Sequence, residues 1–224
     1  MDIKIDMLIR SKRRSIGLEI NDKAELIVRI PKYISLKNLR KAIEPRKAWI
    51  EKKQAIVREN NSNYNPKNFE EGEEFLYLGK KYKLRIIKDT EQIFHFDNEF
   101  VLSEKYKVKA KALFIYWYKQ QAGKIILERA KYFSALHDFN FGSIKITNAA
   151  KRWGSCTGKN NLNFAWRLIL APPEIVDSVV VHELVHTKIK SHSKKFWNKV
   201  YKIMPEYPAY KKWLKENGYL LNIE

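Results

Sequence analysis

The chain has 224 residues, 45% hydrophobic and 31% charged, with a formal net charge of +19. This balance allows a sizeable core and excludes intrinsic disorder, because charged and apolar residues alternate regularly. No run approaches the roughly 18 continuous apolar residues of a membrane span, and the early acids Asp2 and Asp6 are unlike a secretory signal. The single cysteine, Cys156, excludes an internal disulfide framework, so we expect a soluble cytoplasmic protein.

The first part of the chain predicts a hairpin followed by a broken helix. Apolar residues alternate over 15–20 and 26–30 with a polar turn between them, which predicts a β-hairpin that ends at Pro31. Ser35 can cap a helix that follows, and Pro45 breaks or restarts that helix.

Turn-forming residues then divide the chain. The asparagine-rich segment 60–68 predicts a loop or linker. Short strands follow over 75–79, over 82–87 and in a pair around Asp97-Asn98. We place a soft boundary near residue 102 and expect an α+β protein in two parts: a small N-terminal α+β module over 1–102 and a second domain over 103–224.

The second domain predicts long helices and a small sheet. A helix over 103–135 has a candidate buried face that consists of Val108, Ala112, Ile115, Ala122, Ile126 and Leu127. Two strands, 143–148 and 162–170, are joined by a segment that contains the loop 153–158. Pro172-Pro173 then opens another helix, since proline is tolerated in a first turn.

That last helix contains the run His182-Glu183-Leu184-Val185-His186. Histidines four apart lie on one face of a helix, so both imidazoles can reach one ion. Glu183 lies about 100° around the helix from His182, where its carboxylate can reach a metal-bound water. The neighbouring residues are apolar, and buried polar side chains are costly without a partner such as a metal. The run predicts a zinc site with Glu183 as general base.

A catalytic zinc has three protein ligands and one open position for water. His192 is the candidate for the third ligand, but on a continuous helix it would lie about 240° from His186. The helix must therefore end within 187–191, and Ser193 can cap the next one. If His192 is not a ligand, a downstream carboxylate such as Glu206 could take its place.

The chain resembles a known family, the YgjP-like metallopeptidases, which are related to the SprT-like zincins. The resemblance covers nearly the whole chain, including residues 10–16 and 48–50, and is densest from 152 to 214. There it is carried by residues 152–156, 161–163, 167–173, 182–186, 192–197 and 204–214. It implies a zincin-like catalytic half, with an active-site helix packed under a small sheet. It also implies zinc bound by His182, His186 and His192, with Glu183 as base. The histidine spacing matches the metzincin pattern as well, except that Ile189 replaces its glycine.

Motif and resemblance together predict a zinc metallopeptidase that hydrolyses a peptide or protein substrate. Zinc lowers the pKa of its water toward about 7, and Glu183 takes the proton as the water attacks the carbonyl. Tyr207 can hydrogen-bond the developing oxyanion, or it can simply pack on the C-terminal helix. An extended substrate could add to an edge of the 143–170 sheet.

The net charge leaves an alternative open. A basic surface attracts nucleic acid, so the chain could be a nucleic-acid-associated zinc protein, either a protease acting on DNA-bound proteins or a non-catalytic binding module. Lysines spread along nearly the whole chain also keep a protein soluble, and the basic clusters, such as residues 10–14, are short. An intact Glu183 favours catalysis, because a purely structural site needs no base. The sequence does not indicate an oligomeric state.

Overall fold

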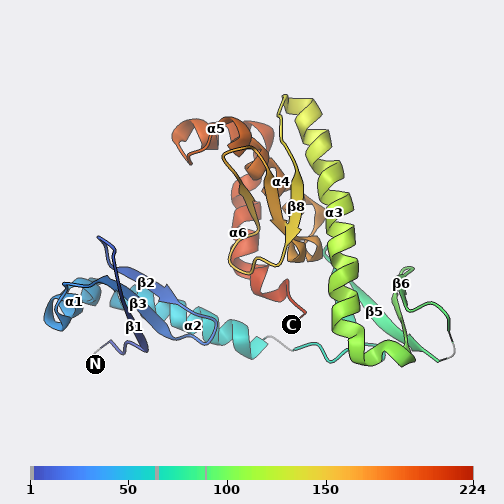
Figure 1. The fold of residues 1–224 in the computed structure, drawn as a ribbon, viewed down its shortest axis with the longest axis horizontal. Coiled ribbons are helices and arrows are strands. Elements are labelled where there is room, and N and C mark those ends of the chain that lie inside the picture. The colour runs from blue at the N-terminus through green and yellow to red at the C-terminus, as the bar shows by residue number, and fades with distance from the viewer. Residues whose placement is uncertain (1–2, 64–65, 89, 224) are drawn as a thin grey trace. The chain divides into compact units, whose positions relative to one another are not determined.

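The computed structural model describes residues 3–63, 66–88 and 90–223 (Figure 1). Helices and several small sheets alternate along the chain, which confirms the predicted α+β class. The chain forms two compact units, Met1–Asn65 and Pro66–Glu224. Across the described residues, no helix combines the length and the hydrophobicity that a membrane crossing requires.

The first unit contains a three-stranded sheet of order β1-β3-β2. Strand β2 (Gly17–Ile20) pairs antiparallel with β3 (Leu26–Pro31), which confirms the predicted hairpin and its end at Pro31. Strand β1 (Met7–Ser11) pairs parallel with β3 and was not predicted from the sequence. One side of β3 is apolar and packs against the helices that follow. The buried core that they form consists of Leu26, Val28, Ile30, Leu39, Ile43 and Ile50.

Two helices complete the first unit. Helix α1 (Leu36–Ile43) begins as predicted, because the Ser35 hydroxyl accepts a hydrogen bond from the Asn38 backbone N–H at 3.2 Å. A 3₁₀ turn (Glu44–Arg46) contains Pro45 and leads into α2 (Lys47–Asn63). The predicted loop 60–68 is therefore wrong in its first residues, which continue α2, while residues 64–65 lie outside the described residues.

The second unit begins with a sheet of order β4-β5-β7-β6, formed by β4 (Glu74–Tyr77), β5 (Lys80–Ile87), β6 (Phe94–Phe96) and β7 (Phe100–Ser103). Leu78 and Gly79 join β4 to β5 with φ of 49° and 77°, the left-handed pair that a two-residue hairpin loop favours. Their N–H groups donate to the carbonyls of Ile169 and Leu170 at 2.9 and 3.1 Å, so the hairpin docks on the segment that precedes α4 (Pro173–Lys188).

The division between the units thus falls after residue 65, and not near residue 102 as the sequence pattern favours. The β4-to-β7 sheet packs on α3 (Ala110–His137) through aromatic rings. The ring centroid of Phe114 on α3 lies 4.3 Å from that of Phe75 and 4.9 Å from that of Phe100. Aromatic rings in such contact form one core, which unites these strands with the helices after them.

Helix α3 buries one residue in every turn, and its buried side chains are Ala110, Phe114, Tyr118, Ala122, Ile126, Ala130 and Phe133. The predicted buried face is confirmed at Ala122 and Ile126 and is wrong at Val108 and Leu127, which are 100% and 38% exposed. Ala112 is exposed as well. Val108 lies in the 3₁₀ helix over residues 104–109 that precedes α3, whereas Ala112 and Leu127 lie within α3 and are exposed there.

A small sheet of order β8-β10-β9 lies next to the predicted motif. Strand β10 (Leu162–Ala165) pairs parallel with β8 (Ile144–Thr147) and antiparallel with β9 (Gly154–Cys156). The predicted loop 153–158 therefore contains a strand. The predicted strand over 162–170 is wrong beyond residue 165, because Trp166–Leu170 form a 3₁₀ helix.

Helix α4 lies at the centre of this half and contacts α3, β9, α5 (Lys194–Ile203) and α6 (Tyr207–Asn217). Figure 1 shows α4 with the β8 sheet between α3 on one side and α6 on the other. A sheet packed on a central helix is the zincin-like arrangement that the resemblance implies. The contacts with α3, β9, α5 and α6 make α4 the central helix of this half.

Candidate metal centre

Helix α4 is fixed in the second unit by apolar packing and by an ion pair to α3. Val180, Val181 and Leu184 are fully buried, so apolar packing surrounds the helix. Asp177 on α4 accepts two hydrogen bonds from the guanidinium of Arg129 on α3, at 2.6 and 2.7 Å. A bidentate pair of this kind restricts both the rotation and the translation of one helix against the other. The side chains of α4 therefore project from a rigid support.

Three histidines meet at the end of α4. Nε2 of His192 lies 3.0 Å from Nε2 of His186 and 3.0 Å from Nε2 of His182. Ligand atoms of all three residues lie within 4.8 Å of one another. Zn–N bonds of about 2.0–2.1 Å in a tetrahedral site would separate the nitrogens by roughly 3.3 Å, close to the distances found. The structure brings together the three histidines expected from the sequence, and their donor set fits a divalent ion.

The second nitrogen of each helical histidine has its own partner. Nδ1 of His186 lies 3.0 Å from the carbonyl oxygen of Ile189, to which a protonated Nδ1 donates. Nδ1 of His182 lies 2.8 Å from the hydroxyl oxygen of Tyr207. The Ile189 carbonyl can only accept, so it holds the proton of His186 on Nδ1 and leaves Nε2 free for a metal, whereas the Tyr207 hydroxyl can accept from or donate to Nδ1 of His182. The sequence left Tyr207 either as a donor to the oxyanion or as a packing residue of the C-terminal helix, and the structure places its hydroxyl within hydrogen-bond distance of the candidate ligand His182.

Burial keeps these imidazoles neutral. The pKa of His182 is lowered to about 3, chiefly by burial and also by positive charge on His186, His192 and Lys211. Burial also lowers the pKa of His186, and its hydrogen bond to the Ile189 carbonyl opposes that change. Only a neutral imidazole can bind a metal ion, so both residues are in the ligating form at neutral pH.

The bend after α4 brings His192 back toward the helix. The helix ends at Lys188, inside the predicted range 187–191, and Ile189 is extended with φ −133° and ψ 99°. Residues 189–193 contain no positive φ, so this bend needs no glycine at Ile189. Nζ of Lys190 donates to the carbonyl of Thr157 at 3.0 Å, which ties the bend to the turn after β9. Glu206, the alternative third ligand, is exposed at the start of α6, outside the histidine group.

Two aromatic residues of α5 support the histidines. The fully buried ring of Phe196 has its centroid 4.4 Å from His186 and 4.9 Å from both His182 and His192. Trp197 stacks on His192 with centroids 5.5 Å apart and an interplanar angle of 20°. From the sequence alone, these two residues had no role at the site and were contained only within the resemblance over 192–197. Their positions four and five residues after His192 are the signal that could have indicated contact with it.

Glu183 lies beside the histidines in a buried position. The residue is 5% exposed, and its Oε2 atom has no hydrogen-bond partner among the described residues. Burial raises the pKa of Glu183 to about 7, and the positive charge of Arg152 opposes the rise. The backbone of β9 is so close that a Cβ on Gly154 would lie 2.6 Å from Oε1 of Glu183. A carboxyl group with a raised pKa and an unused oxygen is suited to proton transfer.

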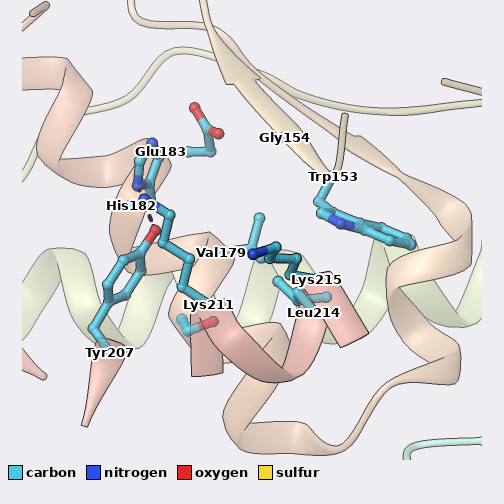
Figure 2. Close-up of a pocket in the computed structure, with 10 residues that line it drawn as sticks. Trp153, Gly154, Val179, His182, Glu183, Tyr207, Lys211, Leu214 and Lys215 are labelled. Carbon is cyan, nitrogen blue, oxygen red and sulfur yellow. Dashed lines mark hydrogen bonds between the residues drawn. The ribbon is translucent and has the colours of Figure 1, made fainter. Parts of the chain in front are cut away.

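A cavity of about 320 Å³ opens next to this centre (Figure 2). It is lined by residues of α4, α6 and the start of β9, namely Trp153, Gly154, Ser178, Val179, His182, Glu183, Tyr207, Lys211, Leu214 and Lys215. Figure 2 shows Tyr207 reaching His182 from α6, with Glu183 on the same side of α4. The catalytic candidates therefore face a space that a substrate can enter.

Comparison with known proteins identifies one family. The model of the YgjP-like family, described as a metallopeptidase domain, matches residues 14–217. A search of curated proteins found no match. Among solved structures, the metallopeptidase zymogen of Methanocaldococcus jannaschii jannalysin is similar with a TM-score of 0.35 and 20% identity, over 39% of this chain and 90% of that one. The family match extends over nearly the entire chain.

Proposed function

Since the chain belongs to the YgjP-like metallopeptidases, we propose that it is a zinc-dependent peptidase with its metal on His182, His186 and His192. Membership of this family makes the chain a metal-dependent hydrolase of peptides. The observation that carries the finer proposal is the convergence of three Nε2 atoms beside the unpartnered carboxylate oxygen of Glu183. Three neutral imidazoles form a common ligand set of catalytic zinc and leave one coordination position open.

Glu183 is the general base of the proposed reaction. Bound zinc would supply a Lewis acid that acidifies a water and polarises the substrate carbonyl. The Glu183 carboxylate accepts the proton of the attacking water and then passes it to the leaving amine nitrogen. A pKa of about 7 suits both steps at neutral pH, because the group can exist in either protonation state.

Tyr207 has two compatible roles. The Nδ1–H of His182 donates to the Tyr207 oxygen, which fixes the ring with Nε2 toward the metal position. The hydroxyl hydrogen of Tyr207 is then free to donate to the oxyanion as it forms. Burial raises the pKa of Tyr207, so the hydroxyl keeps that hydrogen at neutral pH.

Strand β9 offers a place for the substrate backbone. It is an edge of the β8-β10-β9 sheet, and its Gly154 is in contact with Glu183. An extended peptide that adds to this edge would gain main-chain hydrogen bonds and lie across the metal centre. Main-chain recognition of this kind places few demands on the amino-acid sequence of the substrate. Selectivity among substrates then depends on cavities beside the strand that accept substrate side chains.

The variant Glu183→Gln tests the proposal, with cleavage of a mixed peptide library followed by mass spectrometry. We expect the rate to fall by roughly 10²–10⁴-fold while bound zinc is retained, since glutamine keeps the shape but cannot accept a proton. Unchanged cleavage by a zinc-loaded Glu183→Gln protein would remove Glu183 from the mechanism.

The nucleic-acid alternative rests on net charge alone and predicts DNA binding that weakens steeply with salt.

A further inference from the structure

We propose that the cavity beside the metal centre binds a carboxylate of the peptide substrate, carried by an acidic side chain or by a free C-terminus close to the cleaved bond. The inference deepens the proposed peptidase function and rests on it. Its basis is the pair Lys211 and Lys215, which line the same cavity as His182 and Glu183.

The two lysines reach the cavity because of their spacing on α6. Tyr207, Lys211, Leu214 and Lys215 are separated by four, three and one residues, so they share one face of the helix. Tyr207 connects this face to the metal centre through its contact with His182. Figure 2 shows the side chains of Lys211 and Lys215 on the cavity side of α6, one turn apart. A group that enters the cavity from the metal centre therefore meets both lysines.

The charges of these lysines are not neutralised by the protein. Among the described residues, no carboxylate forms an ion pair with Lys211 or Lys215, whereas Lys212 on the adjacent face pairs with Glu216 at 3.9 Å. Nζ of Lys211 lies over the ring of Trp197, 4.7 Å from its centroid, which restrains the amine without cancelling its charge. Glu183 is the acidic residue of the lining, and its role is at the metal. The cavity thus presents two ammonium groups that lack an anion.

The remaining walls suit an acidic side chain. Trp153, Val179 and Leu214 give the cavity apolar surfaces. The methylene groups of a glutamate can pack on such surfaces while its carboxylate meets the lysines. Because the cavity adjoins the catalytic glutamate, the carboxylate belongs to the molecule that is cleaved.

The test is a set of peptides that differ at one position, with glutamate, glutamine or lysine, cleaved by the zinc-loaded full chain. At one position near the cleaved bond, we expect kcat/KM to be roughly tenfold higher for glutamate than for glutamine, with lysine lowest. Peptides with a free or an amidated C-terminus form the second arm. A preference for the free end near the cleaved bond, without one for glutamate, would identify the terminal carboxylate as the occupant.

Variants assign the preference to the two lysines. The double variant Lys211→Gln with Lys215→Gln should lose the preference for a carboxylate, measured as the ratio of kcat/KM for the glutamate peptide to kcat/KM for the glutamine peptide. The control Lys212→Gln makes the same kind of change outside the cavity and should keep the preference. All three lysines are exposed, and thermal unfolding checks that both proteins remain folded.

The outcomes separate the two proposals. Cleavage without any carboxylate preference, or a preference that survives in the double variant, would overturn the inference and leave the peptidase proposal intact. If the zinc-loaded protein cleaves none of the peptides, the peptidase proposal fails and the inference fails with it.

Discussion

A Cβ atom on Gly154 would lie 2.6 Å from Oε1 of Glu183, so the backbone of β9 and the carboxylate of α4 are in direct contact. No side chain larger than hydrogen fits between them without displacing one of the two. Strand β9 is also the edge to which we propose that the substrate backbone adds, so the contact places that edge beside Glu183. In the proposed function, this contact places the substrate strand directly beside the general base.

Gly154→Ala should lower peptide cleavage roughly 10–100-fold while metal binding is retained, because the new methyl group displaces the Glu183 carboxylate and leaves the histidines in place. The measurement is kcat/KM together with bound metal. Gly158→Ala is the control, since nothing lies within 4 Å of a Cβ at that position. Equal activity of the two variants would contradict a close fit at Gly154.

Tyr207→Phe separates the two proposed roles of the tyrosine. If its oxygen orients His182, the variant should bind metal roughly 10–100-fold more weakly, because the Nδ1–H loses its acceptor. A competition titration with a chelator measures this. Loss of kcat at unchanged metal affinity would instead limit Tyr207 to the oxyanion. Tyr201→Phe is a suitable control, since that ring is 42% exposed near Trp197 and its hydroxyl makes no hydrogen bond among the described residues.

Phe196→Ala should weaken both the fold and the metal centre. Removing this buried ring should lower the free energy of unfolding by about 3–5 kcal/mol, as for other large-to-small core changes. It also removes the surface against which all three imidazoles pack. Phe100→Ala removes an equally buried ring from strand β7, away from the histidines, and should cost comparable stability. Metal affinity, measured well below the unfolding temperature, should fall for Phe196→Ala and stay unchanged for Phe100→Ala.

The metal-free protein should respond to pH through Glu183. Burial raises the pKa of Glu183 from 4.5 to about 7, so the folded state binds its proton more tightly than the unfolded state. This contribution to stability is present below pH 4.5 and is lost as the pH rises through about 7. Glutamine carries no such charge. Glu183→Gln should therefore stabilise the chelated protein more at pH 8 than at pH 5, in denaturant titrations at both values. A larger stabilisation at pH 5 than at pH 8 would contradict a buried Glu183 carboxyl group with a raised pKa.

The local sequence pattern was sufficient to predict some of these features. The hairpin of β2 and β3, the cap at Ser35 and the end of α4 near Lys188 were predicted, because alternation, a capping hydroxyl and helical angles are properties of neighbouring residues. The grouping of His182, His186 and His192 followed from their spacing and from the need for a bend.

Contacts between distant segments could not be predicted in this way. Strand β1 pairs in parallel with β3, and nothing in its five residues specifies that partner. Strand β9 has only three residues, too few for an alternation to be visible. The contact of Tyr207 with His182 joins residues 25 positions apart, and it depends on how α6 packs against α4. Only the tertiary fold brings such pairs together.

The central claim is tested most directly by elemental analysis of zinc in the purified protein, beside His192→Ala and Glu183→Gln. We predict one zinc per chain in the wild type and in Glu183→Gln, and a sharply lower content in His192→Ala, because the proposal makes the third imidazole a ligand and the carboxylate a base that does not bind the metal. A well-folded wild-type protein that binds no zinc even when zinc is supplied would contradict a zinc centre at these histidines. Full zinc content in His192→Ala would exclude His192 as the third ligand.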